Sequence, residues 1–156
     1  MTNHEPAQHP APDMAANCAA WVAVFTDLDR SGVPSLERLA EIACADVRFR
    51  DPFNDLRGVA ALRRLLSHTR EGLPGVRFEV LDRAWSGSTV YLRWRMTARV
   101  RVLGDWLVDG MSEVRFAADG RVAEHLDYWD AATQLYGRLP LVGPLLRWLG
   151  RAARVG

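Results

Sequence analysis

The chain has 156 residues with 20 arginines, no lysine, 19 acidic residues and a formal net charge of +1, and 49% of its residues are hydrophobic. This length fits a single domain that buries a sizeable core. A protein that binds nucleic acid normally gathers a basic excess on one face, so the near balance of charge argues against nucleic acid as a partner. Composition by itself predicts a soluble α+β domain and no more.

Cysteine content and apolar runs limit the compartment and the cofactors that we expect. Cys18 and Cys44 both fall in segments predicted to be helical, and they provide neither a disulfide framework nor a metal site. The four histidines show no metal-ligand spacing. No run approaches the ~20 apolar residues that cross a bilayer. A signal peptide carries basic residues before its apolar stretch, and none precedes the apolar stretch 14–26. We expect a cytoplasmic protein without a metal or other cofactor.

The first half of the chain predicts helices and one short strand. Residues 1–12 hold three prolines among polar and small residues and are expected to form a disordered tail before the main domain. Apolar residues then recur at helical spacing over 13–28 and again over 36–44. An alternating segment at 47–51 predicts a short strand that ends before a proline, and a third helix is predicted over 58–72.

The second half of the chain changes to a period of two, which is typical of strands with one buried face. We predict an antiparallel meander of four strands, at 76–84, 89–102, 106–116 and 121–130. The N-terminal helices and this strongly curved sheet are expected to form a cone that encloses a cavity. The cone domain is predicted to span residues 13–137.

The arginines of the second strand lie on its polar face and suggest ion pairs across the first hairpin. If residues 103–105 form the turn, Arg99 lies opposite Asp109. We interpret the arginines as partners in exposed cross-strand ion pairs. The alternative is an anion site, for which Arg93 and Arg101 would be available.

The last hairpin is predicted to bring polar side chains onto the apolar inner face. A turn at 117–120 would place Ser112 opposite His125 and Gly110 opposite Asp127. His125 and Asp127 would then face the cavity among several tryptophans, where loss of hydration changes proton affinity. The predicted pocket lining comprises Trp21, Phe49, Phe53, Trp94, Trp106, Ser112 and Trp129.

Asp51 is the leading candidate for a catalytic residue. It ends the predicted strand, shares a face with Phe49 and Phe53, and has its backbone restricted by Pro52. A carboxylate that projects into an apolar cavity loses hydration and becomes a usable proton acceptor or donor near neutral pH. The alternative is that Asp51 only caps the backbone N–H groups of the turn at Pro52, and both interpretations stay open.

Asp127 and His125 are the other two catalytic candidates. Asp127 either satisfies a polar group of the core, His125 among them, or forms an acid/base pair with Asp51 across the cavity. A lone inward histidine is more often a satisfied core residue, and the sequence places no serine or cysteine nucleophile beside it. His125 is therefore the weaker candidate.

Two segments carry a family resemblance. The segment 44–66, CADVRFRDPFNDLRGVAALRRLL, resembles the surroundings of the catalytic aspartate in ketosteroid isomerases. Together with 109–130, DGMSEVRFAADGRVAEHLDYWD, it resembles the wider SnoaL-like, nuclear transport factor 2-like superfamily over residues 14–136. The resemblance implies a cone-shaped nuclear transport factor 2-like (cystatin-like) fold of class α+β, with N-terminal helices packed on a curved antiparallel sheet.

The resemblance also implies roles for single residues. Asp51 matches the isomerase base that moves a proton between carbons of an enone, whereas Trp21 and Ser112 replace its oxyanion tyrosine and aspartate. Asp127 matches the catalytic aspartate of limonene epoxide hydrolases, whose arginine and second aspartate are absent here. SnoaL-like polyketide cyclases use an acid/base aspartate without a cofactor, which Asp51 or Asp127 could supply.

These resemblances imply a pocket for a small hydrophobic molecule in a cofactor-free isomerase or cyclase that works by proton transfer, and a homodimer. The alternative is a non-catalytic binding or interaction domain of the same fold. Residues 138–156 form an amphipathic, basic tail that we expect to pack across the open end of the cone or on a partner subunit. Contact with a membrane surface is the less favoured alternative for this tail.

Overall fold

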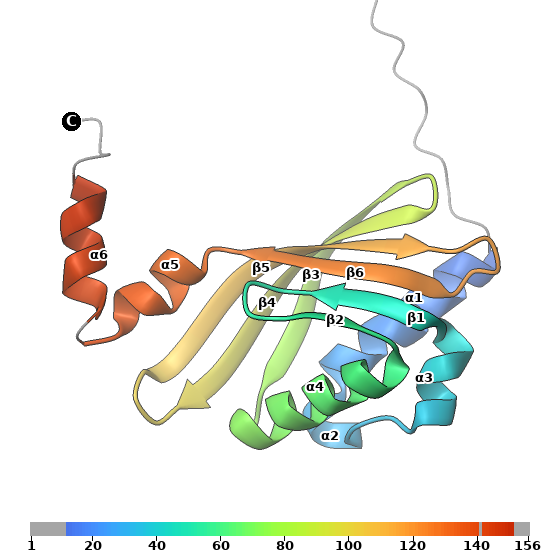
Figure 1. The fold of residues 1–156 in the computed structure, drawn as a ribbon, viewed down its shortest axis with the longest axis horizontal. Coiled ribbons are helices and arrows are strands. Elements are labelled where there is room, and N and C mark those ends of the chain that lie inside the picture. Colours follow the sequence, from blue (N-terminus) through green and yellow to red (C-terminus); the bar gives the residue numbers. More distant parts are fainter. Residues whose placement is uncertain (1–11, 141, 152–156) are drawn as a thin grey trace, which may run out of the picture.

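The computed structural model describes residues 12–140 and 142–151, which form a mixed sheet with its main helices against one face (Figure 1). The helices are α1 (Pro12–Thr26), α2 (Leu28–Ser31), α3 (Leu36–Ile42), α4 (Val59–Gly72), α5 (Ala131–Gln134), the 3-10 helix η1 (Tyr136–Arg138) and α6 (Val142–Arg151). The expected α+β class is confirmed. The predicted tail at residues 1–12 lies outside the described residues except for its last residue, where α1 begins.

The sheet has six strands in the order β2-β1-β6-β5-β4-β3. They are β1 (Ala43–Arg50), β2 (Asp55–Arg57), β3 (Arg77–Ser86), β4 (Thr89–Val100), β5 (Gly104–Phe116) and β6 (Val122–Trp129). The meander from β3 to β6 is confirmed, but the prediction of a four-stranded, wholly antiparallel sheet is wrong. The strands β1 and β2 extend the sheet, and β1 runs parallel to β6.

The strand β1 begins earlier than its sequence pattern predicts. Helix α3 ends at Ile42, so Cys44 lies in β1 and its predicted helical position is wrong. Pairing with β6 is irregular between Ala43 and Arg48, and the inward alternation is regular only from Val47 onward. Because of this irregular stretch, the first half of β1 lacks the alternation of buried and exposed residues by which strands are recognised in a sequence.

The hairpin between β4 and β5 turns two residues earlier than predicted. Gly104 has a φ of +70°, a conformation that glycine adopts without strain, and it pairs with Val100. The predicted pair of Arg99 and Asp109 is therefore wrong, because the register differs by four residues. Side chains alternate between the two faces of a sheet, so a register shift by an even number of residues keeps each one on its predicted face.

The ion pairs of the polar face consequently have other partners than predicted. Arg95 donates from Nε to Asp109 Oδ1 at 2.7 Å, and Arg99 lies 3.8 Å from Asp105. The hydrogen bonds from Arg95 hold the pKa of Asp109 below its usual value. The arginines do form cross-strand ion pairs, as interpreted from the sequence, but with other partners than the predicted register gave them.

The register of the last hairpin differs from the prediction by two residues. Ser112 lies opposite Asp127, not His125, and His125 lies opposite Val114. Gly110 likewise lies opposite Trp129 instead of Asp127. The observed register brings the Ser112 hydroxyl next to the Asp127 carboxylate, so the two side chains can form a hydrogen bond.

The core lies between the sheet and helices α1, α3 and α4, which Figure 1 shows on the same side of the sheet. Each helix contributes at least one side chain with no exposed surface, namely Trp21, Leu39 and Leu62. Full burial of a large apolar side chain stabilises a fold by about 1.5–3 kcal/mol. None of the helices within residues 12–140 and 142–151 is long and apolar enough to cross a membrane.

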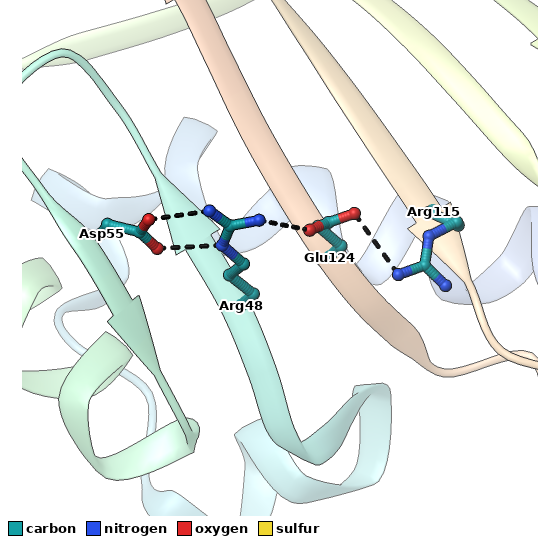
Figure 2. Close-up of polar contacts among 4 residues, drawn as sticks. All are labelled: Arg48, Asp55, Arg115 and Glu124. Carbon is teal, nitrogen blue, oxygen red and sulfur yellow. Dashed lines mark hydrogen bonds and ion pairs between the residues drawn. The ribbon is translucent and has the colours of Figure 1, made fainter.

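An ion-pair network crosses four strands on the opposite face, as Figure 2 shows. Arg48 of β1 donates through Nε and an NH2 group to both oxygens of Asp55 on β2, at 2.9 and 2.7 Å. Its other nitrogen donates to Glu124 of β6 at 3.1 Å, and Glu124 in turn accepts from Arg115 of β5. The network connects the parallel pair β1–β6 to strands on both sides.

The indole of Trp94 lies against a position without a side chain. Trp94 on β4 pairs with Gly110 on β5, and a Cβ at Gly110 would lie 2.4 Å from the indole carbon Cζ2. That distance is far below van der Waals contact, so the indole occupies space that any other residue would fill. Gly110 is therefore required for the observed position of Trp94.

We predict that Gly110→Ala lowers the free energy of unfolding by about 1–3 kcal/mol, the usual effect of overpacking a core. Urea unfolding followed by circular dichroism measures this change. The matched control is Gly72→Ala at the end of α4, where an added Cβ meets nothing within 4 Å. Equal stability of Gly110→Ala and the parent would contradict the packing described here.

A second prediction concerns acid stability. The hydrogen bonds from Arg48 hold the pKa of Asp55 below its usual value of 3.8. A folded-state pKa below the unfolded one stabilises the protein above the unfolded pKa, and this stabilisation disappears as the pH falls through the folded value. Arg48→Met should therefore be less stable than the parent at pH 7, with a smaller difference at pH 3.

The control for this prediction is Arg99→Met, because Arg99 and its partner Asp105 are 85% and 94% exposed and 3.8 Å apart. Such a pair contributes little to stability at any pH. Urea unfolding of the three proteins at pH 7 and pH 3 gives the comparison. A stability loss in Arg48→Met that does not change with pH would assign the effect to packing rather than to the ion pair.

Candidate functional site

Five polar and aromatic side chains form a continuous hydrogen-bonded chain on the inner face of the sheet. At one end, the indole N–H of Trp21 donates to His125 Nδ1 at 2.8 Å. An indole nitrogen only donates, so Nδ1 must accept and the ring carries its proton on Nε2. His125 Nε2 lies 2.8 Å from Asp127 Oδ1 and donates to it.

The other end of the chain is fixed in the same way. The indole N–H of Trp94 donates to Ser112 Oγ at 2.8 Å, which leaves the serine hydroxyl hydrogen free to point elsewhere. Ser112 Oγ donates to Asp127 Oδ1 at 2.5 Å. Asp127 therefore receives one hydrogen bond from each side, and two tryptophans determine the direction of every hydrogen in the chain.

Burial holds this chain rigid. Trp21, Ser112 and His125 are buried, and the Asp127 side chain is 15% exposed. The His125 ring stacks on Phe49 with centroids 5.0 Å apart and lies 5.2 Å from Phe25. The imidazole can therefore neither rotate nor exchange its partners without disturbing the core.

Asp127 also borders the hollow spaces of the molecule. A cavity of about 40 Å³ lies beside Trp21, and an adjoining one of about 150 Å³ lies between α4 and the sheet. Phe25, Phe78 and Trp94 line both cavities and separate them, and Asp127 lines both as well as an outer cleft. Its Oδ2 atom accepts no hydrogen bond from a described residue.

The structure places Asp51 in a turn that occupies its carboxylate. Its Oδ1 atom accepts the backbone N–H groups of Phe53 and Asn54, both at 2.7 Å, and the Asn54 side-chain amide bonds both carboxylate oxygens. These are the local capping bonds of the alternative interpretation. Asp51 nevertheless lines the 150 Å³ cavity and the outer cleft, so a role as a base stays a prediction.

The parallel pairing of β1 and β6 brings the two carboxylates to the same cleft. Phe49 pairs with His125 and Arg50 with Leu126, so the next residues along the two strands are Asp51 and Asp127. Both line the 150 Å³ cavity and the cleft. The three catalytic candidates thus occupy one region, although Asp51 has no hydrogen bond to the chain that contains the other two.

Each residue predicted to line the pocket borders one of the two cavities. Trp21, Ser112 and Trp94 border the smaller one, while Phe49, Phe53, Trp94, Trp106 and Trp129 border the larger one. The prediction omitted Phe25 and Phe78, which lie between the two cavities. The spacing of Phe25 gave a signal, because it follows Trp21 by four residues and so shares its helix face.

The ionisable groups that line the two cavities are Asp51, Asp127 and His125. Among residues 12–140 and 142–151 no group of three histidine, cysteine, aspartate or glutamate side chains could hold a metal ion. Cys18 is buried, and burial raises the pKa of its thiol, which keeps it protonated and a poor nucleophile. The described groups that can move a proton at the cavities are thus the carboxylates and His125.

The fold recurs in solved structures. A candidate SnoaL-like polyketide cyclase from Jannaschia Sp. CCS1 is 17% identical over 81% of this chain and 93% of its own, with a TM-score of 0.63. An LEH-like epoxide hydrolase from M. tuberculosis is 15% identical over 88% of this chain and 99% of its own, with a TM-score of 0.63. A third structure is a protein from Catenulispora acidiphila DSM 44928 with a ketosteroid isomerase-like fold, in complex with trimethylamine. It is 14% identical over 84% of this chain and 95% of its own, with a TM-score of 0.65.

These TM-scores show a shared fold and confirm the expected nuclear transport factor 2-like architecture. No curated protein matches the chain in sequence. The SnoaL-like domain family matches residues 18–125, which include α1 from Cys18 onward, the strand that carries Phe49, and the meander as far as His125 in β6. The chain therefore belongs to the SnoaL-like domain family.

Proposed function

We propose that the chain binds a small apolar molecule between α1, α4 and the sheet and moves a proton on it without a cofactor, as an isomerase or cyclase. The observation that carries this proposal is the Asp127 carboxylate. The carboxylate lies at the edge of two apolar cavities. One of its oxygens is held by two donors, and the other accepts no hydrogen bond from a described residue. This arrangement presents an oriented proton acceptor to a bound ligand.

Cavity size supports a ligand of about one ring. The larger cavity has a volume of about 150 Å³, comparable to engineered apolar cavities of ~150 Å³ that bind benzene. Pockets for drug-sized ligands usually measure about 300–1,000 Å³. A polycyclic substrate would require Phe25 or Phe78 to move, because these rings separate the two cavities.

The proposed reaction conserves all atoms of the substrate. Asp127 Oδ2 takes a proton from a carbon next to a carbonyl group, and the electron pair of that C–H bond moves toward the carbonyl oxygen to give an enolate. The same proton then returns from Asp127 to another carbon, and the double bond changes place. His125 and Ser112 hold Oδ1 throughout and so keep Oδ2 directed at the ligand.

The hydrogen-bonded chain favours Asp127 over Asp51 as the base. Both oxygens of Asp51 already accept bonds within its turn. The hydrogens of Trp21 and Ser112 are also engaged, one with His125 and the other with Asp127, so neither is free to stabilise an enolate oxygen. Asp51 is therefore proposed as a second carboxylate that shapes the charge of the cleft.

Epoxide hydrolysis is less well supported despite the neighbour that carries this name. The positions that would hold the arginine and second aspartate of that reaction hold Trp94 and Met96, both buried. Trp94 engages its only N–H with Ser112, and Met96 has no ionisable group. The alternative with more support is a non-catalytic binding domain, in which the hydrogen-bonded chain only satisfies polar groups of the core.

The test uses the isomerisation of cyclohex-3-enone to cyclohex-2-enone, a one-ring reaction that produces a conjugated enone with a strong ultraviolet absorbance. We predict that Asp127→Asn lowers the rate by about 10²–10⁴-fold, the usual contribution of a general base. The asparagine carbonyl can still accept from His125 and Ser112, so the fold and the cavity stay intact. Asp51→Asn should retain a much larger share of the activity.

Binding of the product cyclohex-2-enone, measured by tryptophan fluorescence, provides the control. Asp127→Asn should bind it with an affinity close to that of the parent, because the change is isosteric. Binding without isomerisation by the parent would favour the non-catalytic alternative. Equal rates in parent and Asp127→Asn would remove Asp127 from the mechanism, and a greater loss in Asp51→Asn would assign the base to Asp51.

A further inference from the structure

The C-terminal helix α6 uses one side to attach to the rest of the chain. Its Gly143 N–H donates to Leu139 O at 2.8 Å, and the Arg147 guanidinium donates to Gly137 O at 2.8 Å. Gly143 is buried, and a Cβ at this position would lie 2.4 Å from Gly137 O. The absence of a side chain thus lets this side of the helix lie directly against the η1 segment.

The opposite side of α6 is apolar and exposed. With 3.6 residues per turn, four apolar residues fall on the side away from Gly143 and Arg147. These are Val142, Leu145, Trp148 and Leu149, with exposed fractions of 39%, 56%, 64% and 53%. Figure 1 shows α6 beyond the end of the sheet, apart from the helices α1, α3 and α4 that cover the core.

The charge of the C-terminal segment is strongly one-sided. All 19 acidic residues of the chain precede Ala131, whereas Arg138, Arg147, Arg151 and Arg154 follow it. An apolar helix face that contains tryptophan and leucine, together with arginines and no acid, is typical of helices that lie in the interface of an anionic membrane. The apolar face and the excess of positive charge in this segment together favour an anionic membrane surface as the partner.

The segment before α6 connects this face to the mouth of the cavity. Tyr136 of η1 meets Phe53 edge to face at 6.2 Å, and Phe53 meets Trp129 at 5.5 Å. The indole of Trp106 donates to Gln134 O at 2.8 Å. The rings of Phe53, Trp106 and Trp129 line the 150 Å³ cavity, so η1 joins α6 to the aromatic lining of this cavity.

We propose that the apolar face of α6, formed by Val142, Leu145, Trp148 and Leu149, binds the surface of membranes that contain anionic lipid. The leucines and Trp148 insert at the boundary between headgroups and acyl chains, and the net positive charge of residues 131–156 attracts the anionic headgroups. The interaction does not depend on the reaction proposed above. If that reaction occurs, the attachment places the cavity where apolar molecules concentrate.

The test is cosedimentation of the full chain with vesicles of phosphatidylcholine alone and of phosphatidylcholine with phosphatidylglycerol at 3:1. The chain should bind the anionic vesicles at least tenfold more tightly, and 0.5 M NaCl should weaken this binding. The double variant Leu145→Glu/Trp148→Glu should lose binding at least tenfold. Its matched control is Leu107→Glu, an exposed leucine on the sheet that should bind like the parent.

A charge variant separates the two contributions. Arg151→Gln/Arg154→Gln should weaken binding to anionic vesicles by about fivefold for each arginine, the equivalent of roughly 1 kcal/mol per basic residue near the surface. It should leave the weak binding to neutral vesicles unchanged. Because both double variants change only the C-terminal segment, isomerisation of cyclohex-3-enone in solution should match the parent, which distinguishes failure of this proposal from failure of the proposed function.

Two results would overturn the proposal. One is equal sedimentation of the parent and Leu145→Glu/Trp148→Glu with anionic vesicles. The other is a parent that binds no vesicles and whose mass by light scattering is that of a dimer, while the same variant is a monomer. That second outcome would assign the apolar face of α6 to a second copy of this chain.

Discussion

The arrangement of the inner face depends on the two hydrogen bonds that meet at Asp127 Oδ1. They come from His125 and Ser112, and each of these donors accepts an indole N–H on its other side, which leaves its own hydrogen for Asp127. A buried polar group is tolerated only when its bonds are satisfied, and here every member of the chain has a partner. The carboxylate is therefore fixed in position by donors on β5 and β6, which are themselves held by indoles on β4 and α1.

That meeting point depends on strand register, which the sequence pattern predicts only in part. Alternation correctly assigned Ser112, His125 and Asp127 to the inner face, because a period of two survives any even shift. It could not distinguish a pairing of Ser112 with His125 from the observed pairing with Asp127, two residues away. The face was predictable from local hydrophobicity, whereas the hydrogen-bond partner depends on the geometry of the turn.

The edge of the sheet was harder to predict than its centre. The strands from β3 to β6 follow one another through hairpins, so local patterns and turn residues suffice to identify them. The parallel pairing of β1 with β6 joins segments more than seventy residues apart, and the irregular start of β1 weakens its pattern. Asp51 was consequently recognised as a strand-end carboxylate, and a shared site with Asp127 was only one alternative; this long-range pair is what brings both to the same cleft.

The two indoles at the ends of the hydrogen-bonded chain also isolate it. An indole nitrogen neither accepts a hydrogen bond nor gives up its proton in the physiological range, so Trp21 and Trp94 interrupt any relay of protons through His125 or Ser112 toward bulk water. A proton on the free oxygen of Asp127 therefore cannot pass inward through the core and can leave only through the cavities and the outer cleft that Asp127 lines. Exchange of such a proton with solvent is therefore confined to the outer cleft, and none of it passes through the core.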